Sequence, residues 1–149
     1  MRAVIQRVSR GAVVVDGATV GAVERGLLVY LGVGPTDTET DVDYVANKVR
    51  YLRIFPDEAG KMNLDVALAG GGVLLISNFS LYADIRQGRR PAFTDAADPA
   101  MAERLYESVA ARIRALGVPV ETGRFGAMMA VSSENAGPIN ILLDSHKAF

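Results

Sequence analysis

The sequence contains no cysteine, and its only histidine, His146, lies three residues before the last position. The absence of cysteine excludes disulfide bonds, thiolate metal sites and a cysteine nucleophile. A Ser-His-Asp triad would have to use His146, and a histidine-rich metal site cannot form. We therefore expect chemistry that relies on hydroxyl groups, backbone groups, carboxylates or the substrate itself, without a metal ion or a cofactor.

Long apolar runs and a strong charge of either sign are also missing. No apolar run approaches the roughly 20 residues of a membrane-spanning helix, and no apolar targeting segment follows a basic start. We therefore expect a cytoplasmic protein that does not contact a membrane. The formal net charge of −1 argues against a general nucleic-acid coat protein, which would be strongly basic. Contact with a few phosphates stays open, because Arg86, Arg89 and Arg90 fall within five residues.

The length of 149 residues fits one domain with a core of its own, and no linker or low-complexity segment divides the chain. Apolar segments predict strands at residues 3–8, 11–15, 18–23, 26–33, 73–76, 118–121, 127–132 and 139–143. Residues 26–33 and 73–76 are apolar on both faces, which is typical of central strands. Asp16-Gly17 is a two-residue hairpin signal between the second and third segments.

Two amphipathic segments predict long helices, because their apolar side chains recur at spacings of three and four. The first helix is expected to be capped by Thr36, Thr38 or Thr40 and to end near Leu52. The second is expected to begin at Asp98-Pro99 and to stop at Gly117. Hydroxyl and carboxylate caps, proline in the first turn and glycine after the last are the usual helix boundaries. We expect one α/β domain over residues 1–149, with a mixed, strongly curved, barrel-like sheet and two long helices.

The segment Ser77-Asn78-Phe79-Ser80-Leu81 directly follows the apolar strand at 73–76. Two hydroxyl groups, an amide and an aromatic ring thus lie beside the core at a strand end, where ligands often bind. The alternative is a strand that has reached the surface, where Asn78 and Ser80 satisfy a turn.

The segment Asn135-Ala136-Gly137-Pro138 lies between two predicted strands. Glycine followed by proline in that position is typical of a tight turn. A proline that introduces a buried strand can also be cis, and it then holds the adjacent carbonyl groups in fixed directions. Fixed carbonyls suit a site that distinguishes enantiomers, because no side-chain rotamer can adapt to the wrong one.

Three further segments carry weaker signals. The loop at 86–91 (RQGRRP) could contact phosphates or an RNA terminus, or form a solvated or subunit-contacting loop. Residues 121–129 (ETGRFGAMM) place Phe125 near two methionines, a combination that can stack on a base or pack in a core. Arg7 shares a strand face with Ala3 and Ile5, so we expect it to be partly buried and to need carbonyl or carboxylate partners.

Together these segments resemble the D-aminoacyl-tRNA deacylase family from Met1 to about Ser145. The resemblance includes, in the same order, MRAVIQRVSR, LRIFPDEAGKMN, the QGRRPAF loop and ETGRFGA. The family signatures Ser-Gln-Phe-Thr-Leu and Asn-x-Gly-Pro-x-Thr correspond to Ser77-Asn78-Phe79-Ser80-Leu81 and Asn135-Ala136-Gly137-Pro138-Ile139-Asn140. Several ordered segments over nearly the whole chain are more specific than either signature alone.

The resemblance implies an ester hydrolase that proofreads aminoacyl-tRNA. Its substrate would be the ester that joins a D-amino acid, or glycine mischarged on tRNA-Ala, to the 3′-terminal adenosine, and its products free amino acid and tRNA. The resemblance further implies binding of RNA and not of DNA. It also implies a homodimer in which the Gly-Pro turn of one subunit enters the site of the other and rejects L-aminoacyl-tRNA.

The resemblance also implies roles for individual residues. The catalytic segment would consist of Ser77, Asn78, Phe79 and Ser80. The substrate-binding residues would be Arg7, Phe125, Met129, Asn135, Gly137 and Pro138. Backbone N–H groups of the catalytic segment are the expected oxyanion donors. The cis Gly137-Pro138 carbonyls would bind the amino group of the substrate, Arg7 would brace this turn, and Phe125 and Met129 would flank the adenine.

Two roles stay open for Ser80. An aminoacyl ester is already activated and the neighbouring ribose hydroxyl can assist, so orientation and oxyanion stabilisation can suffice without a side-chain base. Ser80 acting as a nucleophile would need an activating histidine or lysine, and none is evident. The chain departs from the family pattern at Asn78, Ser80, Met128, Ala136 and Asn140. Rate, tRNA preference and chiral strictness therefore stay open.

Three other interpretations are compatible with the sequence. A non-catalytic binder of aminoacyl-tRNA ends would have lost activity with the altered signatures. A hydrolase of some other small acyl substrate would act on free D-amino-acid esters about as well as on tRNA-linked ones. A structural dimerisation module would show no effect of RNA on its stability.

Overall fold

A mixed sheet is the framework of the computed structural model, which describes residues 1–149. Its strands are β1 (Arg2–Val15), β2 (Ala18–Val23), β3 (Gly26–Gly32), β6 (Gly72–Ser77), β7 (Val120–Thr122) and β8 (Ala130–Asp144). The strand order is β2-β1-β3-β6-β7, and β8 pairs with β1. The β1 strand pairs antiparallel with β2, β3 and β8, whereas β6 runs parallel to both β3 and β7.

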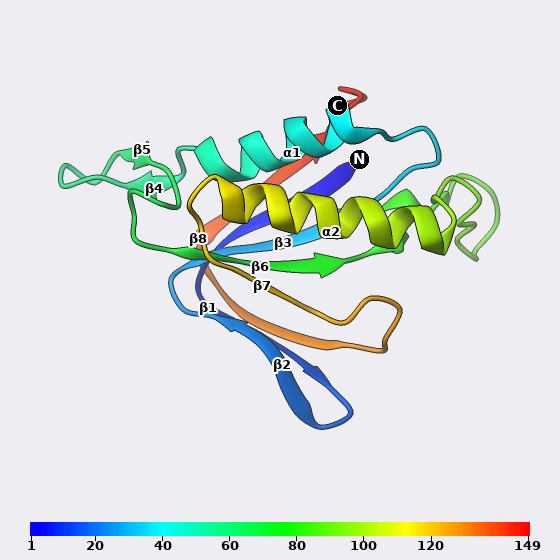
Figure 1. The fold of residues 1–149 in the computed structure, drawn as a ribbon, viewed down its shortest axis with the longest axis horizontal. Coiled ribbons are helices and arrows are strands. Elements are labelled where there is room, and N and C mark those ends of the chain that lie inside the picture. Colours follow the sequence, from blue (N-terminus) through cyan, green and yellow to red (C-terminus); the bar gives the residue numbers. More distant parts are fainter.

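Two long helices, α1 (Glu39–Tyr51) and α2 (Pro99–Ala115), lie side by side over one face of the sheet (Figure 1). A hairpin of β4 (Phe55–Pro56) and β5 (Met62–Leu64) extends beyond the end of α1, and a short 3-10 helix, η1 (Phe79–Tyr82), follows β6. No helix is long and apolar enough to cross a membrane.

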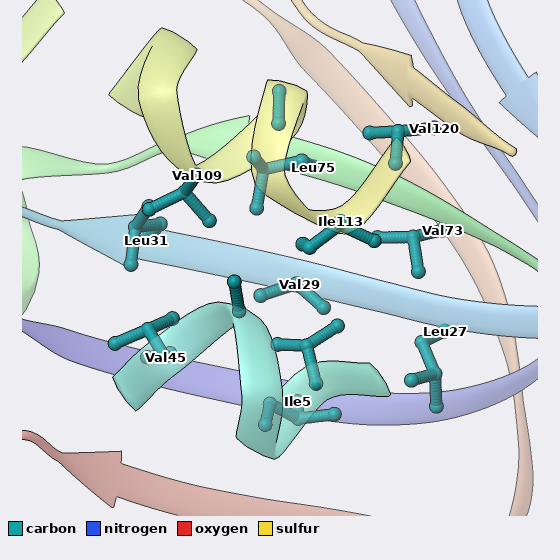
Figure 2. Packing of buried hydrophobic residues seen from close by; sticks show 14 of the residues in the cluster. Ile5, Leu27, Val29, Leu31, Val45, Val73, Leu75, Val109, Ile113 and Val120 are labelled. Carbon is teal, nitrogen blue, oxygen red and sulfur yellow. The ribbon is translucent and has the colours of Figure 1, made fainter. Parts of the chain in front are cut away.

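The main core fills the space between the helices and the sheet. Figure 2 shows side chains of α1, α2, β1, β3, β6 and β7 that meet there, among them Val45, Val109, Ile113, Ile5, Val29, Val73, Leu75 and Val120. A second cluster packs on the other face of the sheet and contains Val8, Val13, Leu28, Leu74 and Ile76. Alternate residues of β3 and β6 thus enter different cores, which explains why these central strands are apolar on both faces.

The sheet curves until β2 approaches β7. A Cβ atom on Gly21 of β2 would lie only 2.5 Å from the carbonyl oxygen of Thr122 in β7. Glycine is therefore needed where the two backbones meet. This close approach confirms the expectation of a strongly curved, barrel-like sheet.

Local signals predicted the helix and hairpin boundaries correctly. Thr38 is the N-cap of α1, and the Asp98 carboxylate caps α2, whose first residue is a proline. Gly117 follows α2 with a φ of +85°. Asp16 and Gly17 both have positive φ angles, 50° and 79°, as a type I′ hairpin turn requires.

Two predicted breaks between strands are wrong. Residues 3–8 and 11–15 belong to one continuous strand, β1, and residues 130–143 belong to one continuous strand, β8. The reason is that β1 and β8 pair with each other along almost their full lengths, with local shifts in register. Ladder hydrogen bonds on both sides of each irregular segment hold it in the strand, and the local sequence does not reveal this.

Candidate active site

A cavity of about 780 Å³ opens where β6 ends and α2 begins. It is lined by the end of β3, the segment Ser77 to Ser80, the residues from Phe93 to the first turn of α2, and the β7–β8 loop at residues 125–129. Most of the lining is apolar with a few polar groups, as is usual for small-molecule sites. Six predicted site residues therefore share this cavity, namely Ser77, Asn78, Phe79, Ser80, Phe125 and Met129.

Asn78 organises the turn after β6. Its Oδ1 accepts a hydrogen bond from the backbone N–H of Ser80 at 3.1 Å and a second one from the Ser80 hydroxyl. This side chain, one methylene shorter than the glutamine of the signature that the segment resembles, thus folds back onto its own turn. No histidine, lysine or carboxylate forms a hydrogen bond with the Ser80 hydroxyl, so no side chain is placed to remove its proton.

Three of the four backbone N–H groups at residues 78–81 are used within the protein. Asn78 donates to the carbonyl of Leu31 at 2.8 Å, Ser80 donates to Asn78 Oδ1, and Leu81 donates to the carbonyl of Asn78 at 3.4 Å. The N–H of Phe79 donates to no side chain and to no loop carbonyl. Because Phe79 also lines the cavity, its N–H is the backbone donor of this turn that is left for a bound oxygen atom.

Phe125 and Met129 belong to the β7–β8 loop. The ring centroid of Phe125 lies 6.1 Å from that of the buried Tyr106, which anchors it to α2. A Cβ atom on Gly123 would lie 2.6 Å from the sulfur of Met129, so the glycine makes room for this side chain. Met128, in contrast, is 93% exposed and stands at the edge of the cavity.

Tyr30 of β3 also lines the cavity, although it was not among the site residues predicted from the sequence. The only available signal was a single hydroxyl-bearing residue in the apolar run GLLVYLG. Burial raises the pKa of Tyr30 above its usual 10.0. Its hydroxyl group therefore stays protonated at neutral pH and can donate a hydrogen bond, but it cannot act as a base.

Gly137 and Pro138 lie in a bulge of β8 that faces Arg7 of β1. Asn135 pairs with Val8 and Asn140 pairs with Gln6, so residues 136–139 loop out between two ladder positions. The Gly137-Pro138 peptide bond is cis, which is one of the two possibilities indicated by the sequence, and both residues are exposed. The prediction of a tight turn between two strands is therefore wrong, because these residues form a bulge within the single strand β8.

Side chains hold the bulge from both ends. Asn135 accepts a hydrogen bond from the Ile139 N–H at 3.0 Å on Oδ1 and donates from Nδ2 to Asn140 Oδ1 at 2.5 Å. Asn140, at the position where the resembled signature has threonine, thus serves as an acceptor for Asn135. The carbonyls of Gly137 and Pro138 accept no hydrogen bond from any side chain or loop.

Arg7 braces the same bulge. Its Nε donates to the carbonyl of Ala136 at 3.0 Å, and its Nη1 donates to the carbonyl of Ile54 at 2.7 Å. The expectation of a partly buried arginine with carbonyl partners is confirmed. Gly137 has a φ of +132°, and a Cβ atom on it would lie 2.8 Å from Ile139 Cγ1 and 3.0 Å from Arg7 Nη2. The site accepts only glycine at this position.

The bulge and the cavity are far apart within one chain. The bulge faces Arg7, which is in register with Leu27 and Val73, whereas Ser77 is in register with Leu31, four residues further along the strands. Four residues correspond to about 13 Å, and three strand spacings from β8 to β6 add about 14 Å across the sheet. The predicted site residues thus fall into two groups on the order of 20 Å apart.

His146 belongs to neither group. Its Nε2 lies 2.7 Å from Asp37 Oδ1 and 3.5 Å from Asp41 Oδ1. Ligand atoms of these three residues lie within 4.8 Å of one another, but Asp37 Oδ1 also pairs with the amino group of Met1 at 2.6 Å. None of these residues lines the cavity, so no triad forms with Ser77 or Ser80.

The chain is similar to a well-populated family. The family described as D-Tyr-tRNA(Tyr) deacylase matches residues 4–144. The D-aminoacyl-tRNA deacylase of Koribacter versatilis (strain Ellin345) is 56% identical over 149 residues, which cover 100% of both chains. That of Lacticaseibacillus casei (strain BL23) is 55% identical over 145 residues, or 97% of this chain and 98% of its own.

Two solved structures share the fold. A structure named c-Myc DNA Unwinding Element Binding Protein has a TM-score of 0.92 and 35% sequence identity, with 97% of this chain and 98% of its own covered. A structure named as that of a probable eukaryotic D-amino acid tRNA deacylase has a TM-score of 0.82 over 95% of this chain and 97% of its own. Its identity is 16%, so it supports the fold alone.

Proposed function

The chain belongs to the D-Tyr-tRNA deacylase family and is a hydrolase of the ester bond in D-aminoacyl-tRNA, and we propose that it cleaves this ester in the cavity beside Ser77–Ser80. The main support for placing the reaction here is the N–H of Phe79, which is unused within the protein and lies at the wall of an apolar cavity. A hydrogen-bond donor held in a fixed direction is what a tetrahedral oxyanion needs.

In this proposal the ester carbonyl binds with its oxygen toward the Phe79 N–H. A water molecule adds to the carbonyl carbon, and the bond from that carbon to the ribose 3′-oxygen breaks. The neighbouring ribose 2′-hydroxyl helps to transfer the proton from the water to the departing 3′-oxygen. The protein contributes orientation and oxyanion stabilisation, which is consistent with the lack of any side-chain base near Ser80.

The terminal adenine would occupy the apolar part of the same cavity. Phe125 offers an aromatic face and Met129 a polarisable thioether, and both side chains line the cavity. Stacking on aromatic and sulfur-containing side chains tolerates any base, so the terminal nucleotide would be held without a demanding set of hydrogen bonds.

The chiral filter would come from the partner subunit of a homodimer. The amino group and the ester carbon of an aminoacyl group are only about 2.5 Å apart. The bulge and the cavity of one chain are on the order of 20 Å apart. They therefore cannot contact the amino group and the ester carbon of the same substrate. The exposed Gly137-Pro138 carbonyls, which have no partners among the side chains or loops, are available for the ammonium group of a substrate bound to the partner.

This arrangement also explains why glycine would be accepted. Rigid carbonyls that exclude an L side chain do not touch the position of a D side chain, and glycine has no side chain at either position. We therefore include glycyl-tRNA, in particular glycine mischarged on tRNA-Ala, among the substrates. A role in proofreading before translation would place the protein in the cytoplasm.

The experiment that tests this function compares D-Tyr-tRNA, L-Tyr-tRNA and Gly-tRNA as substrates. We expect rapid release of D-tyrosine and glycine and persistence of the L ester. Protection of all esters without turnover would instead support a non-catalytic binder of aminoacyl-tRNA ends. Equal hydrolysis of D-tyrosine methyl ester would indicate a hydrolase of small acyl substrates.

The contribution of the partner is tested by mixing two inactive variants. Gly137→Ala alters the bulge, and Ala127→Trp fills the cavity. A mixed dimer contains one doubly altered site and one unaltered site if the bulge serves the partner. We expect activity to return after the two variants are unfolded and refolded together. If the mixture stays inactive although mixed dimers form, the bulge serves its own chain and the proposed geometry is wrong.

A further inference from the structure

The arginine-rich loop between η1 and α2 is attached to the mouth of the cavity. The Phe93 ring, at the end of this loop, lies edge-on to Phe79, with ring centroids 4.9 Å apart. Asp84 and Ala92 exchange backbone hydrogen bonds at 2.7 and 2.9 Å, so the intervening residues form a closed loop. Gly88 has a φ of +73° and turns the chain at the tip.

Within this loop only one arginine has a carboxylate partner. Arg86 forms two parallel hydrogen bonds with Asp84, from Nε and Nη2, each 2.8 Å long. This pairing raises the pKa of Arg86 and lowers that of Asp84 below its usual 3.8. Both groups stay ionised, so the charge of Arg86 is balanced by that of Asp84, and the pair fixes the base of the loop.

Arg89 and Arg90 have no such partner. Both are exposed, and neither forms an ion pair or a side-chain hydrogen bond with any residue. Pro91 follows them directly and limits the backbone freedom of the loop. Their two positive charges therefore face solvent, on the loop whose Phe93 lines the cavity, and are available to an anionic ligand.

A third free guanidinium lies on the β7–β8 loop. Arg124 is exposed, has no carboxylate within ion-pair distance, and precedes the cavity residue Phe125. Figure 1 shows the loop at 84–97 and the β7–β8 loop on the side of the molecule where α2 begins. The cavity between them is lined from both sides, by Phe93 and by Phe125. The two loops that line the mouth thus carry three unpaired cations, on a chain whose net charge is −1.

We propose that Arg89 and Arg90, together with Arg124, bind phosphodiester groups of the unpaired 3′ strand of the tRNA that leads into the cavity. The inference rests on the proposed function and names the part of the substrate beyond the terminal adenosine. An apolar mouth with aromatic side chains and flanking arginines is the usual combination in single-strand binding, where bases stack and phosphates meet guanidinium groups. The exposed Phe79 and Met128 at the mouth, 61% and 93% accessible, complete that combination.

The test compares two D-tyrosyl esters, one on whole tRNA and one on adenosine alone, which has no phosphate. For Arg89→Ala/Arg90→Ala, we expect kcat/KM on tRNA to fall roughly tenfold at about 100 mM salt, mainly through KM. The slope of log(kcat/KM) against log[salt] should become shallower by about 1.4, since each phosphate contact on a single strand contributes about 0.7. Hydrolysis of the adenosine ester should not change.

Three further variants test the contribution of each charge. Arg124→Ala should reduce the salt slope by about 0.7. Lys61→Ala, which removes an exposed cation from the β4–β5 hairpin at the other end of the molecule, should leave both substrates unaffected. An Arg89→Lys/Arg90→Lys variant keeps the charge, so it should retain most of the salt slope while it loses part of the affinity.

Three results would overturn the proposal. Equal losses on tRNA and on the adenosine ester would place the effect in the cavity and not on phosphates. An unchanged salt slope in the double variant would mean that the loop makes no phosphate contact. Loss of subunit association in light scattering would make the loop a subunit contact. In contrast, a wild-type protein inactive on both esters would contradict the proposed function itself.

Discussion

Arg7 connects two segments that are distant in the sequence, because its Nε donates to the carbonyl of Ala136 while its Nη1 donates to the carbonyl of Ile54. One guanidinium thus ties the bulge of β8 to the segment that precedes β4. The contact lies beneath the Gly137-Pro138 peptide and limits how far that peptide can move. Arg7 is therefore a positioning residue, and its contribution can be measured separately from that of the cavity.

The first prediction concerns Arg7→Met, which keeps an unbranched apolar side chain as far as the position of Nε and removes the guanidinium donors. Two partly buried carbonyls lose their partners, so we expect unfolding to be easier by about 1–3 kcal/mol in urea titrations. Deacylation of D-Tyr-tRNA should fall at least tenfold because the bulge carbonyls are no longer fixed. The control is Arg10→Met, whose exposed ion pair with Glu134 should be worth less than about 1 kcal/mol. A destabilised Arg7→Met with unchanged kcat/KM would show that the bulge does not depend on this arginine.

The second prediction separates Ser80 from Asn78. If the Ser80 hydroxyl is a turn contact and not a nucleophile, Ser80→Ala should keep kcat within about tenfold of the wild type. Asn78→Ala removes the acceptor for the Ser80 N–H and hydroxyl, frees the turn that presents the Phe79 N–H, and should lower kcat by about a hundredfold. Single-turnover deacylation measures both. Abolished chemistry with intact tRNA binding in Ser80→Ala would restore the nucleophile mechanism.

The third prediction concerns Gly137→Ala. An added methyl group would meet Ile139 and Arg7 in a backbone conformation that alanine rarely adopts. We expect loss of D-Tyr-tRNA hydrolysis by a factor of at least about 100, because the carbonyls are displaced by an ångström or more. Gly60→Ala is the matched control, since Gly60 also has a positive φ, +77°, but nothing lies near its Cβ position. It should lower stability by about 1 kcal/mol and leave turnover unchanged. Comparable turnover in the two variants would argue against the filter.

The fourth prediction is a pH dependence of stability that arises from Asp65. Burial acts to raise the pKa of this carboxyl, but the N–H of Leu68 and the ion pair with Arg50 at 2.8 Å outweigh it and lower the pKa below 3.8. The folded pKa is thus lower than the unfolded one. The stabilisation is complete above pH about 4 and is lost as the pH falls through the folded pKa.

Asp65→Asn tests this directly. The variant should unfold more easily than the wild type at pH about 6, by about 1 kcal/mol, and the difference should shrink toward pH about 3. Urea titrations at several pH values give both curves. A difference that stays constant over this range would mean that the carboxylate charge does not contribute.

Features with strong local causes were predictable from the sequence. The Thr38 and Asp98 caps, the Asp16-Gly17 hairpin and the apolar strands at β3 and β6 all follow from the chemistry of a few neighbouring residues. The continuity of β1 and β8 was not predictable in that way. Each strand contains an irregular segment that is held in place by the other strand, and a single strand does not reveal its partner.

The candidate site was likewise predictable from the sequence only in part. The density of polar groups at Ser77–Ser80 identified one wall of the cavity, but Tyr30 and Phe93 reach it only through the packing of β3 and of the loop before α2. The resemblance associated the Gly137-Pro138 bulge with the same site. The pairing register of β8, β1, β3 and β6 shows that the bulge and the cavity lie apart within one chain. This separation is the reason why the proposed function needs a second subunit.

The β8 strand has one free edge over its whole length, since it pairs only with β1. Free edges of this length are places where sheets of different molecules can join and form insoluble aggregates. In β8 the bulge at residues 136–139 interrupts the row of backbone groups, and Pro138 has no N–H to offer to an added strand. The same four residues that are proposed to select the substrate thus also limit uncontrolled pairing of β8, so variants that straighten the bulge should be less soluble as well as less selective.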